Sequence, residues 1–176
     1  VRGLANYDFS ESEIIVSIAA DFLGDWQGGG FDCSYAKGRI PKNGKMSRHI
    51  QFESNMTLSG ANADLRVPLK IDEQKLVLLE LHKVFLGSKK LSIKSDLKLS
   101  AKILNIVKQT IKEIKSAKDG AVIITGIKDE MYQSLVLEIN EKINSKSYLP
   151  QKSIFKRNGK DEDVNDLIKR MSDGQV

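Results

Sequence analysis

The chain has 176 residues, 40% of them hydrophobic and 29% charged, a composition that is typical of a globular domain and excludes an intrinsically disordered chain. Lysine and arginine number 28 against 23 aspartates and glutamates, so the net charge is +5 at neutral pH. Most lysines lie on the polar faces of predicted helices and aromatic residues make up only 6%, so the stacking surface of a nucleic-acid-binding protein is not predicted.

The length favours one domain over residues 1–176. The first residues lack the charged start and apolar core of a signal peptide, and the chain does not begin with Met. We therefore expect a fragment of a longer protein. No stretch approaches the roughly 18 uncharged apolar residues of a membrane span, so no membrane insertion is expected.

Cysteine and histidine usage predicts no metal site. The single cysteine, Cys33, excludes an internal disulfide and leaves no cysteine pair for zinc or an iron–sulfur cluster. His49 and His82 are far apart in sequence and do not have ligand spacing. No nucleophile lies near a candidate base in a known catalytic motif, so no catalytic residue is predicted.

The first predicted element is a β-branched run at residues 13–19, which has the length and composition of a buried parallel strand. A long loop follows over residues 20–30, with Trp26 and three consecutive glycines. Regular structure is disfavoured there, because each glycine loses more backbone entropy on folding than other residues do. Trp26 is predicted either to plug the edge of the sheet or to form a pocket wall. Residues 32–47 look irregular, with one helical turn near their start.

A basic turn at residues 41–45 resembles a phosphate-binding loop at Gly44-Lys45, but two of its requirements fail. Met46 stands where Ser or Thr should hold a metal ion, and Arg39 stands where the first glycine belongs. The three glycines of the preceding loop likewise fail the dinucleotide fingerprint, since Cys33 takes the third glycine position. Neither nucleotide motif is predicted.

A strand at residues 48–53 leads into a loop of small residues, 54–64, and then a short apolar run that Pro68 closes. Small residues allow close approach of a bulky partner, and open α/β sheets hold ligands at the carboxyl ends of strands. A loop that only turns the chain is the alternative interpretation.

The remaining elements alternate between amphipathic and apolar patterns. They are helices at residues 72–86 and 96–118 joined by a lysine-rich connection at 88–95, a strand at 121–126, a helix at 129–144, a short edge strand at 153–155 and a last helix at 161–171. This order predicts an α/β fold with a mainly parallel sheet.

Several stretches resemble one family: residues 7–9, 16–24, 44–48, 53–66, 122–126 and 167–176. They resemble the molybdopterin oxidoreductase-like half of the iron–sulfur subunit of alternative complex III, the quinol:cytochrome c oxidoreductase, within the DMSO reductase and formate dehydrogenase superfamily. Asp25-Trp26 after Phe22-Leu23-Gly24 is similar to the Bacteroidetes branch. The resemblance covers nearly the whole chain and implies a three-layer, Rossmann-like domain whose sheet is flanked by helices.

In the molybdenum enzymes of this superfamily, molybdopterin guanine dinucleotide contacts loops at the carboxyl ends of strands. The resemblance places the following residues at cofactor-contacting positions: Asp21, Phe22, Leu23, Gly24, Thr57, Gly60, Ala61 and Asp64. Val67-Pro68-Leu69 departs from the family's Leu-Pro order, and no residue here corresponds to the ligand of molybdenum.

The resembling subunit is regarded as having lost the cofactor, so the resemblance implies a non-catalytic scaffold in a respiratory electron-transfer complex. Its expected partners are the iron–sulfur domain of the same polypeptide and other subunits, at the periplasmic face of the inner membrane, with the clusters elsewhere in the parent protein. The alternative is a domain that binds molybdopterin guanine dinucleotide in an active oxidoreductase. Arg48 and Arg66 are the nearest cations for its phosphates, whereas Asp21 and Asp25 oppose a polyanion.

Overall fold

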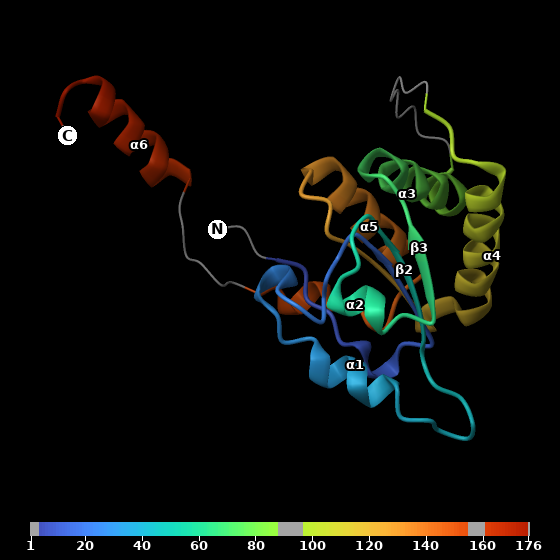
Figure 1. The fold of residues 1–176 in the computed structure, drawn as a ribbon. Helices are drawn as coiled ribbons and strands as arrows, with labels where there is room; N and C mark the ends of the chain where they lie inside the picture. The colour runs from blue at the N-terminus through green and yellow to red at the C-terminus, as the bar shows by residue number, and fades with distance from the viewer. Residues whose placement is uncertain (1–3, 88–96, 155–160, 176) are drawn as a thin grey trace. The chain divides into compact units, whose positions relative to one another are not determined.

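The computed structural model describes residues 4–87, 97–154 and 161–175 (Figure 1). The chain divides into two compact units, a larger one, Tyr7–Tyr148, and a smaller one that combines Val1–Asn6 with Leu149–Val176. The predicted connection at 88–95 lies outside the described residues. The single domain expected from the length stays a prediction.

The larger unit is built on a four-stranded sheet in which every neighbouring pair of strands is parallel. The strands are β1 (Ile14–Ile18), β2 (Arg48–Glu53), β3 (Leu65–Pro68) and β4 (Ala121–Thr125), and their order is β3-β2-β1-β4. All residues of β1 and β4 are buried, as their β-branched composition predicted. The fold is therefore a Rossmann-like α/β fold, which confirms the predicted class.

Strand β3 was not predicted. It has four residues and pairs with β2 so that Leu65 lies opposite Ile50. A run this short shows no clear alternation, and its Pro68 argues against a strand except at an edge of a sheet, where β3 lies. The short helix α2 (Leu58–Ala61) lies between β2 and β3, where the sequence predicts a loop.

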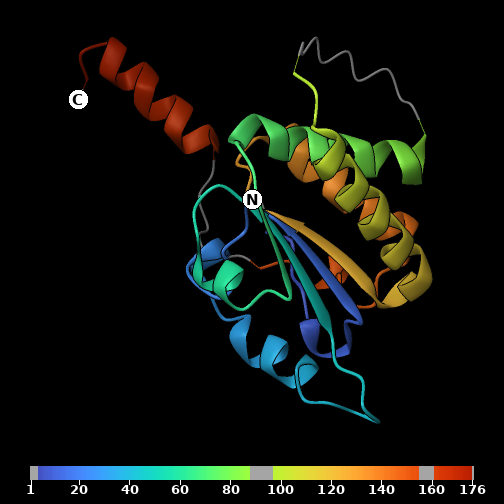
Figure 2. The same cartoon turned by 45° about the vertical axis from the view of Figure 1, so that its right-hand side comes forward.

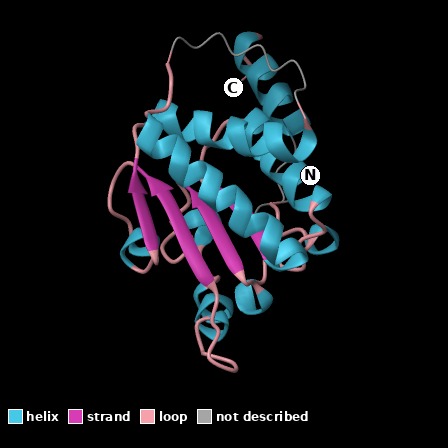
Figure 3. Ribbon diagram, turned by 90° about the vertical axis from the view of Figure 1, so that its right-hand side faces the viewer, coloured by secondary structure: helices cyan, strands magenta, loops and turns pink. Residues whose placement is uncertain are grey.

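One face of the sheet is covered by three helices, α3 (Ile71–Leu86), α4 (Ala101–Ala117) and α5 (Glu130–Lys142) (Figures 2 and 3). Their apolar stripes form one core with alternate residues of the strands, such as Val16 of β1 and Ile123 of β4. Helix α4 begins later than predicted, because the Ser100 hydroxyl caps it by accepting a hydrogen bond from the Ile103 N–H at 3.3 Å.

The other face of the sheet packs against aromatic rings and the short helix α1 (Asp32–Gly38), which is longer than the single turn predicted. Among the described residues seven Tyr, Phe and Trp rings form this aromatic cluster, with neighbouring centroids 5.0 to 6.5 Å apart: Tyr7, Phe9, Phe22, Trp26, Phe31, Tyr35 and Tyr148. The Trp26 indole N–H donates to the Thr125 carbonyl at 3.1 Å, so this side chain plugs the β4 edge of the sheet.

Asn140 of α5 closes the same edge. Its side-chain amide accepts from the Ile123 N–H at 2.9 Å and donates to the Ile123 carbonyl at 2.7 Å, as a neighbouring strand would. Both Asn140 and Ile123 are fully buried, so these bonds satisfy groups that water does not reach.

The smaller unit contains an antiparallel bridge between Leu4 and Ile154, a 3-10 turn at Pro150–Lys152 and helix α6 (Asp161–Ser172). The predicted edge strand at 153–155 is reduced to this bridge where it is described, and residue 155 lies outside the described residues. The predicted last helix is confirmed. None of the described helices is long and apolar enough to cross a membrane.

Candidate functional site at the carboxyl ends of the strands

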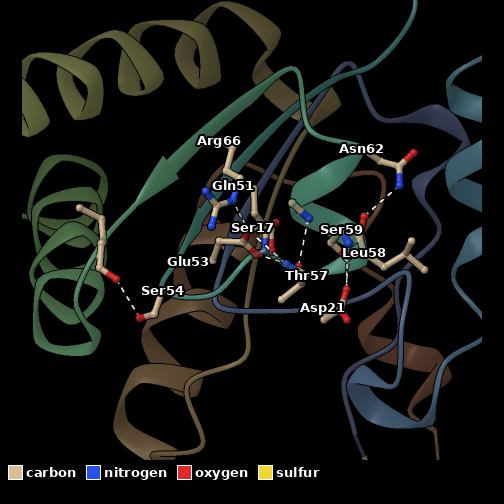
Figure 4. Close-up of polar contacts among 12 residues, drawn as sticks. Ser17, Asp21, Gln51, Glu53, Ser54, Thr57, Leu58, Ser59, Asn62 and Arg66 are labelled. Atoms are coloured by element: carbon tan, nitrogen blue, oxygen red, sulfur yellow. Dashed lines mark hydrogen bonds and ion pairs between the residues drawn. The ribbon is translucent and has the colours of Figure 1, made fainter.

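Ser59 joins the two loops singled out by the sequence. The Asp21 carboxylate oxygen Oδ1 accepts hydrogen bonds from the Ser59 N–H at 2.9 Å and from the Ser59 hydroxyl at 2.8 Å (Figure 4). The same hydroxyl accepts from the Leu23 N–H at 2.9 Å. The loop after β1 and helix α2 after β2 therefore lie together, as expected, at the carboxyl ends of adjacent strands.

Thr57 caps helix α2. Its hydroxyl accepts from the Gly60 N–H at 3.0 Å and donates to the Glu53 carboxylate at 2.6 Å, while the Thr57 N–H donates to the same carboxylate at 3.3 Å (Figure 4). Together with the bond from Ser59 to Asp21, these contacts occupy three N–H groups at or next to the amino end of the helix. These are the groups that would face a phosphate in a dinucleotide site.

Glu53 is a buried carboxylate, 2% exposed, at the end of β2. Besides Thr57 it accepts hydrogen bonds from Arg66 Nε at 2.5 Å and from the Gln51 amide at 3.2 Å. Burial alone would raise the pKa of Glu53, but the bonds from Thr57 and Arg66 outweigh it and hold the pKa below its usual value. Arg66, a candidate phosphate ligand from the sequence, is thus engaged by the chain's own carboxylate.

Gly24 and Gly60 leave room for these carboxylates. A Cβ atom at Gly60 would lie 1.9 Å from Glu53 Oε1, and one at Gly24 would lie 2.3 Å from Asp21 Oδ2. The close approach that the small residues allow is therefore made to side chains of this chain. Of the other expected contact residues, Phe22 is buried in the aromatic cluster and Ala61 is exposed on α2.

Asp64 does not join the other expected contact residues. Helix α2 turns the chain back, so Asp64 precedes β3 at the opposite end of the sheet, where its carboxylate accepts from the His49 N–H at 2.7 Å. Arg39 binds the same carboxylate through both guanidinium nitrogens, at 2.6 and 2.9 Å. Burial opposes ionisation of Asp64, but the Arg39 bonds outweigh it and hold its pKa below the usual value.

A row of polar side chains along β2 was not recognised from the sequence, although His49, Gln51 and Glu53 alternate and therefore share one face. The Gln51 amide donates to the Ala20 carbonyl at 3.1 Å and to Glu53, so its oxygen must face His49 Nε2, 3.1 Å away. His49 Nε2 therefore carries the proton, and Nδ1 faces the Tyr35 hydroxyl at 3.3 Å.

His49 is neutral at physiological pH, because burial lowers its pKa to about 4 despite the hydrogen bond to Gln51. This row connects the carboxyl end of β2, at Glu53, with the Arg39–Asp64 pair at its amino end. The row holds β2 against the loops on both sides, and its members satisfy one another's hydrogen bonds.

Metal-ligating side chains do not gather in the described part of the chain, where no group of three His, Cys, Asp or Glu residues could hold an ion. Cys33 is exposed on α1, and the buried His82 lies 3.2 Å from Glu138 of α5. Two open depressions, of about 590 and 510 Å³, lie at the amino ends of the strands, away from Asp21 and Thr57.

The charges of the candidate site are largely compensated within the chain. Asp21 and Glu53 accept hydrogen bonds from α2 and its cap, and Arg66 pairs with Glu53. Arg48, the other cation expected near the phosphates, lies at the amino end of β2, away from the site, and pairs with Glu113 at 2.8 Å. A pyrophosphate group would have to displace the hydrogen bonds of Asp21 and Glu53 and lie beside these two carboxylates.

In the comparisons with known proteins, no protein-family model and no curated protein matches this chain.

Proposed function

We propose that this chain is a non-catalytic, molybdopterin oxidoreductase-like scaffold domain of the iron–sulfur subunit of a respiratory quinol:acceptor oxidoreductase. The family assignment rests on the resemblance of the motifs. The loss of cofactor binding is supported by the candidate site, where the chain's own carboxylates take the hydrogen bonds that a ligand phosphate would need. The observation that carries the proposal is that Asp21 and Glu53 already accept hydrogen bonds from the N–H groups at the amino end of α2.

The physical reason is competition between anions. Asp21 and Glu53 already bind donors at α2, and two further negative charges from a pyrophosphate would meet repulsion from both carboxylates. Breaking these bonds would take the two Thr57 donors away from the buried Glu53, at a cost of about 1 to 3 kcal/mol for each bond lost. The loop after β1 and helix α2 therefore stabilise each other and leave no N–H groups of Thr57 and Ser59 for a phosphate.

In the proposed role, the domain holds the cluster-bearing domain of the same polypeptide and neighbouring subunits in position while electrons pass from quinol to an acceptor. The periplasmic face of the inner membrane is the location that the resemblance implies. Iron–sulfur clusters are assigned to the rest of the parent protein, and this domain contributes neither a metal ligand nor a catalytic residue.

GDP is a suitable probe, because it is the guanosine pyrophosphate half of molybdopterin guanine dinucleotide. Titration calorimetry of the full-length parent protein should give no saturable heat with GDP. Saturable micromolar binding that is lost in Thr57→Val but retained in Lys108→Glu, a change on the exposed face of α4, would support the cofactor-binding alternative instead.

A further inference from the structure

A groove of about 590 Å³ lies at the amino ends of β1 and β2, far along the sheet from the candidate site. One wall is formed by residues 10–13 and the other by the end of α1 and the turn that follows it, within residues 37–47. Figure 2 shows this turn projecting below the strands beside α1. We call this feature the amino-edge groove.

The turn that forms the second wall is fixed without a partner. Lys42 and Lys45 exchange backbone hydrogen bonds of 2.8 and 3.0 Å, and Asn43 and Gly44 both have positive φ, as in a tight two-residue hairpin. At its base, Arg39 binds the Ser47 carbonyl and Asp64. A surface that is already ordered loses little entropy when it binds.

This rigid turn displays apolar side chains between lysines. Ile40 is 61% exposed and Met46 is 50% exposed, and both line the groove with Lys37, Lys42 and Lys45. Exposed apolar groups that are rimmed by charge are typical of interaction surfaces. Lys42 lies 3.9 Å from the Glu11 carboxylate of the first wall, so Lys37 and Lys45 are the lysines that favour a partner with carboxylates beside apolar side chains.

Ser47 and Gly38 line the floor of the groove, where the chain packs tightly. Only 3% of Ser47 is exposed, and within the described residues its buried hydroxyl has no hydrogen-bond partner. A Cβ atom at Gly38 would lie 2.8 Å from the Phe9 carbonyl oxygen and 3.3 Å from Ser47 Oγ. A partner would therefore meet the exposed walls of the groove rather than this floor.

We propose that the amino-edge groove docks an extended segment of a partner polypeptide in which carboxylates alternate with apolar side chains. Glu11 and Glu13 on the first wall and the carboxyl end of α1 oppose a phosphate dianion, whereas single carboxylates can reach the lysine wall. The inference rests on the proposed scaffold function, since the partner would be a neighbouring polypeptide of the assembly.

The test is fluorescence anisotropy of the full-length protein with a labelled peptide in which Asp and Leu alternate. Lys45→Glu should weaken binding by about five- to tenfold, because an attraction becomes a repulsion, while the matched control Lys108→Glu on α4 leaves it unchanged.

Three results would overturn the inference: no binding of the Asp-Leu peptide, equal binding of a neutral Asn-Leu peptide, or equal loss in Lys108→Glu. Tighter binding of a single-stranded oligonucleotide would also replace it with a nucleic-acid surface. Each of these outcomes leaves the scaffold proposal standing, because that proposal is tested separately by the cofactor content of the parent protein.

Discussion

The Glu53 carboxylate is the most constrained acidic group of the candidate site. It is almost fully buried, accepts bonds from Thr57, Arg66 and Gln51, and lies against the backbone of Gly60. A carboxylate in this setting is stable only while all of its partners remain in place. Gly60 is therefore required because a Cβ atom there would overlap the Glu53 carboxylate, whether or not any ligand binds.

The substitution Gly60→Ala tests this role. The new methyl group would overlap Glu53 Oε1, so we expect a loss of about 2 to 3 kcal/mol in the free energy of unfolding, measured by urea denaturation. In a Glu53→Ala background the same substitution should cost nothing, since the overlap is gone and alanine suits a helix better than glycine. An equal loss in both backgrounds would contradict the account.

His49 predicts how stability depends on pH. Its pKa is lowered to about 4 by burial, below the value of about 6.5 in the unfolded chain, so the unfolded state binds more protons between these values. Stability should therefore fall as the pH drops from 6.5 towards 4, by up to about 3 kcal/mol.

The control for this dependence is His49→Gln, which should unfold with a free energy that is flat between pH 6.5 and 5. Glu53 and Asp64 have lowered pKa values, so their contributions are present above the unfolded pKa and are lost only at lower pH, as the pH falls through the folded values. If the unfolding free energy of His49→Gln still falls between pH 6.5 and 5, the pH dependence comes from a group other than His49.

At the scale of elements, the Ser59 hydroxyl makes two of the three hydrogen bonds by which Ser59 joins the loop after β1 to helix α2. Ser59→Ala would leave the Leu23 N–H and one Asp21 bond unmade, so we expect a loss of about 1 to 2 kcal/mol in unfolding free energy and faster hydrogen exchange at Leu23. Ser34→Ala on α1 removes only a local bond to Phe31 and should cost less than about 0.5 kcal/mol. Unchanged exchange at Leu23 would show that the Ser59 hydroxyl does not hold the loop after β1.

The sequence predicted the long elements well, because β-branched runs and helical periodicity are strong local signals. It placed β2 at its observed bounds and predicted that the loops after β1 and β2 meet. It misplaced Asp64, since the turn made by the four-residue helix α2 leaves no periodic signal. The Arg39–Asp64 pair and the row through Gln51 depend on contacts between distant residues, which local patterns do not contain.

At the scale of the whole molecule, the side chains of Asn140 and Trp26 close the β4 edge of the parallel sheet. Loops at its carboxyl ends bind one another, while a preformed groove lies at its amino ends. This arrangement suits a domain that is held by partners better than one that holds a dinucleotide. The scaffold proposal follows from that distribution together with the family resemblance.

The most direct test of this proposal is the metal and cofactor content of the full-length parent protein, purified with its native complex. Molybdenum, tungsten and iron would be measured by mass spectrometry, and pterin by fluorescence after oxidation. If the domain is a scaffold without the cofactor, the parent protein will contain iron but no molybdenum, tungsten or pterin. Stoichiometric molybdenum or tungsten together with pterin would contradict it and would make the loops at Asp21 and Thr57 a working cofactor site.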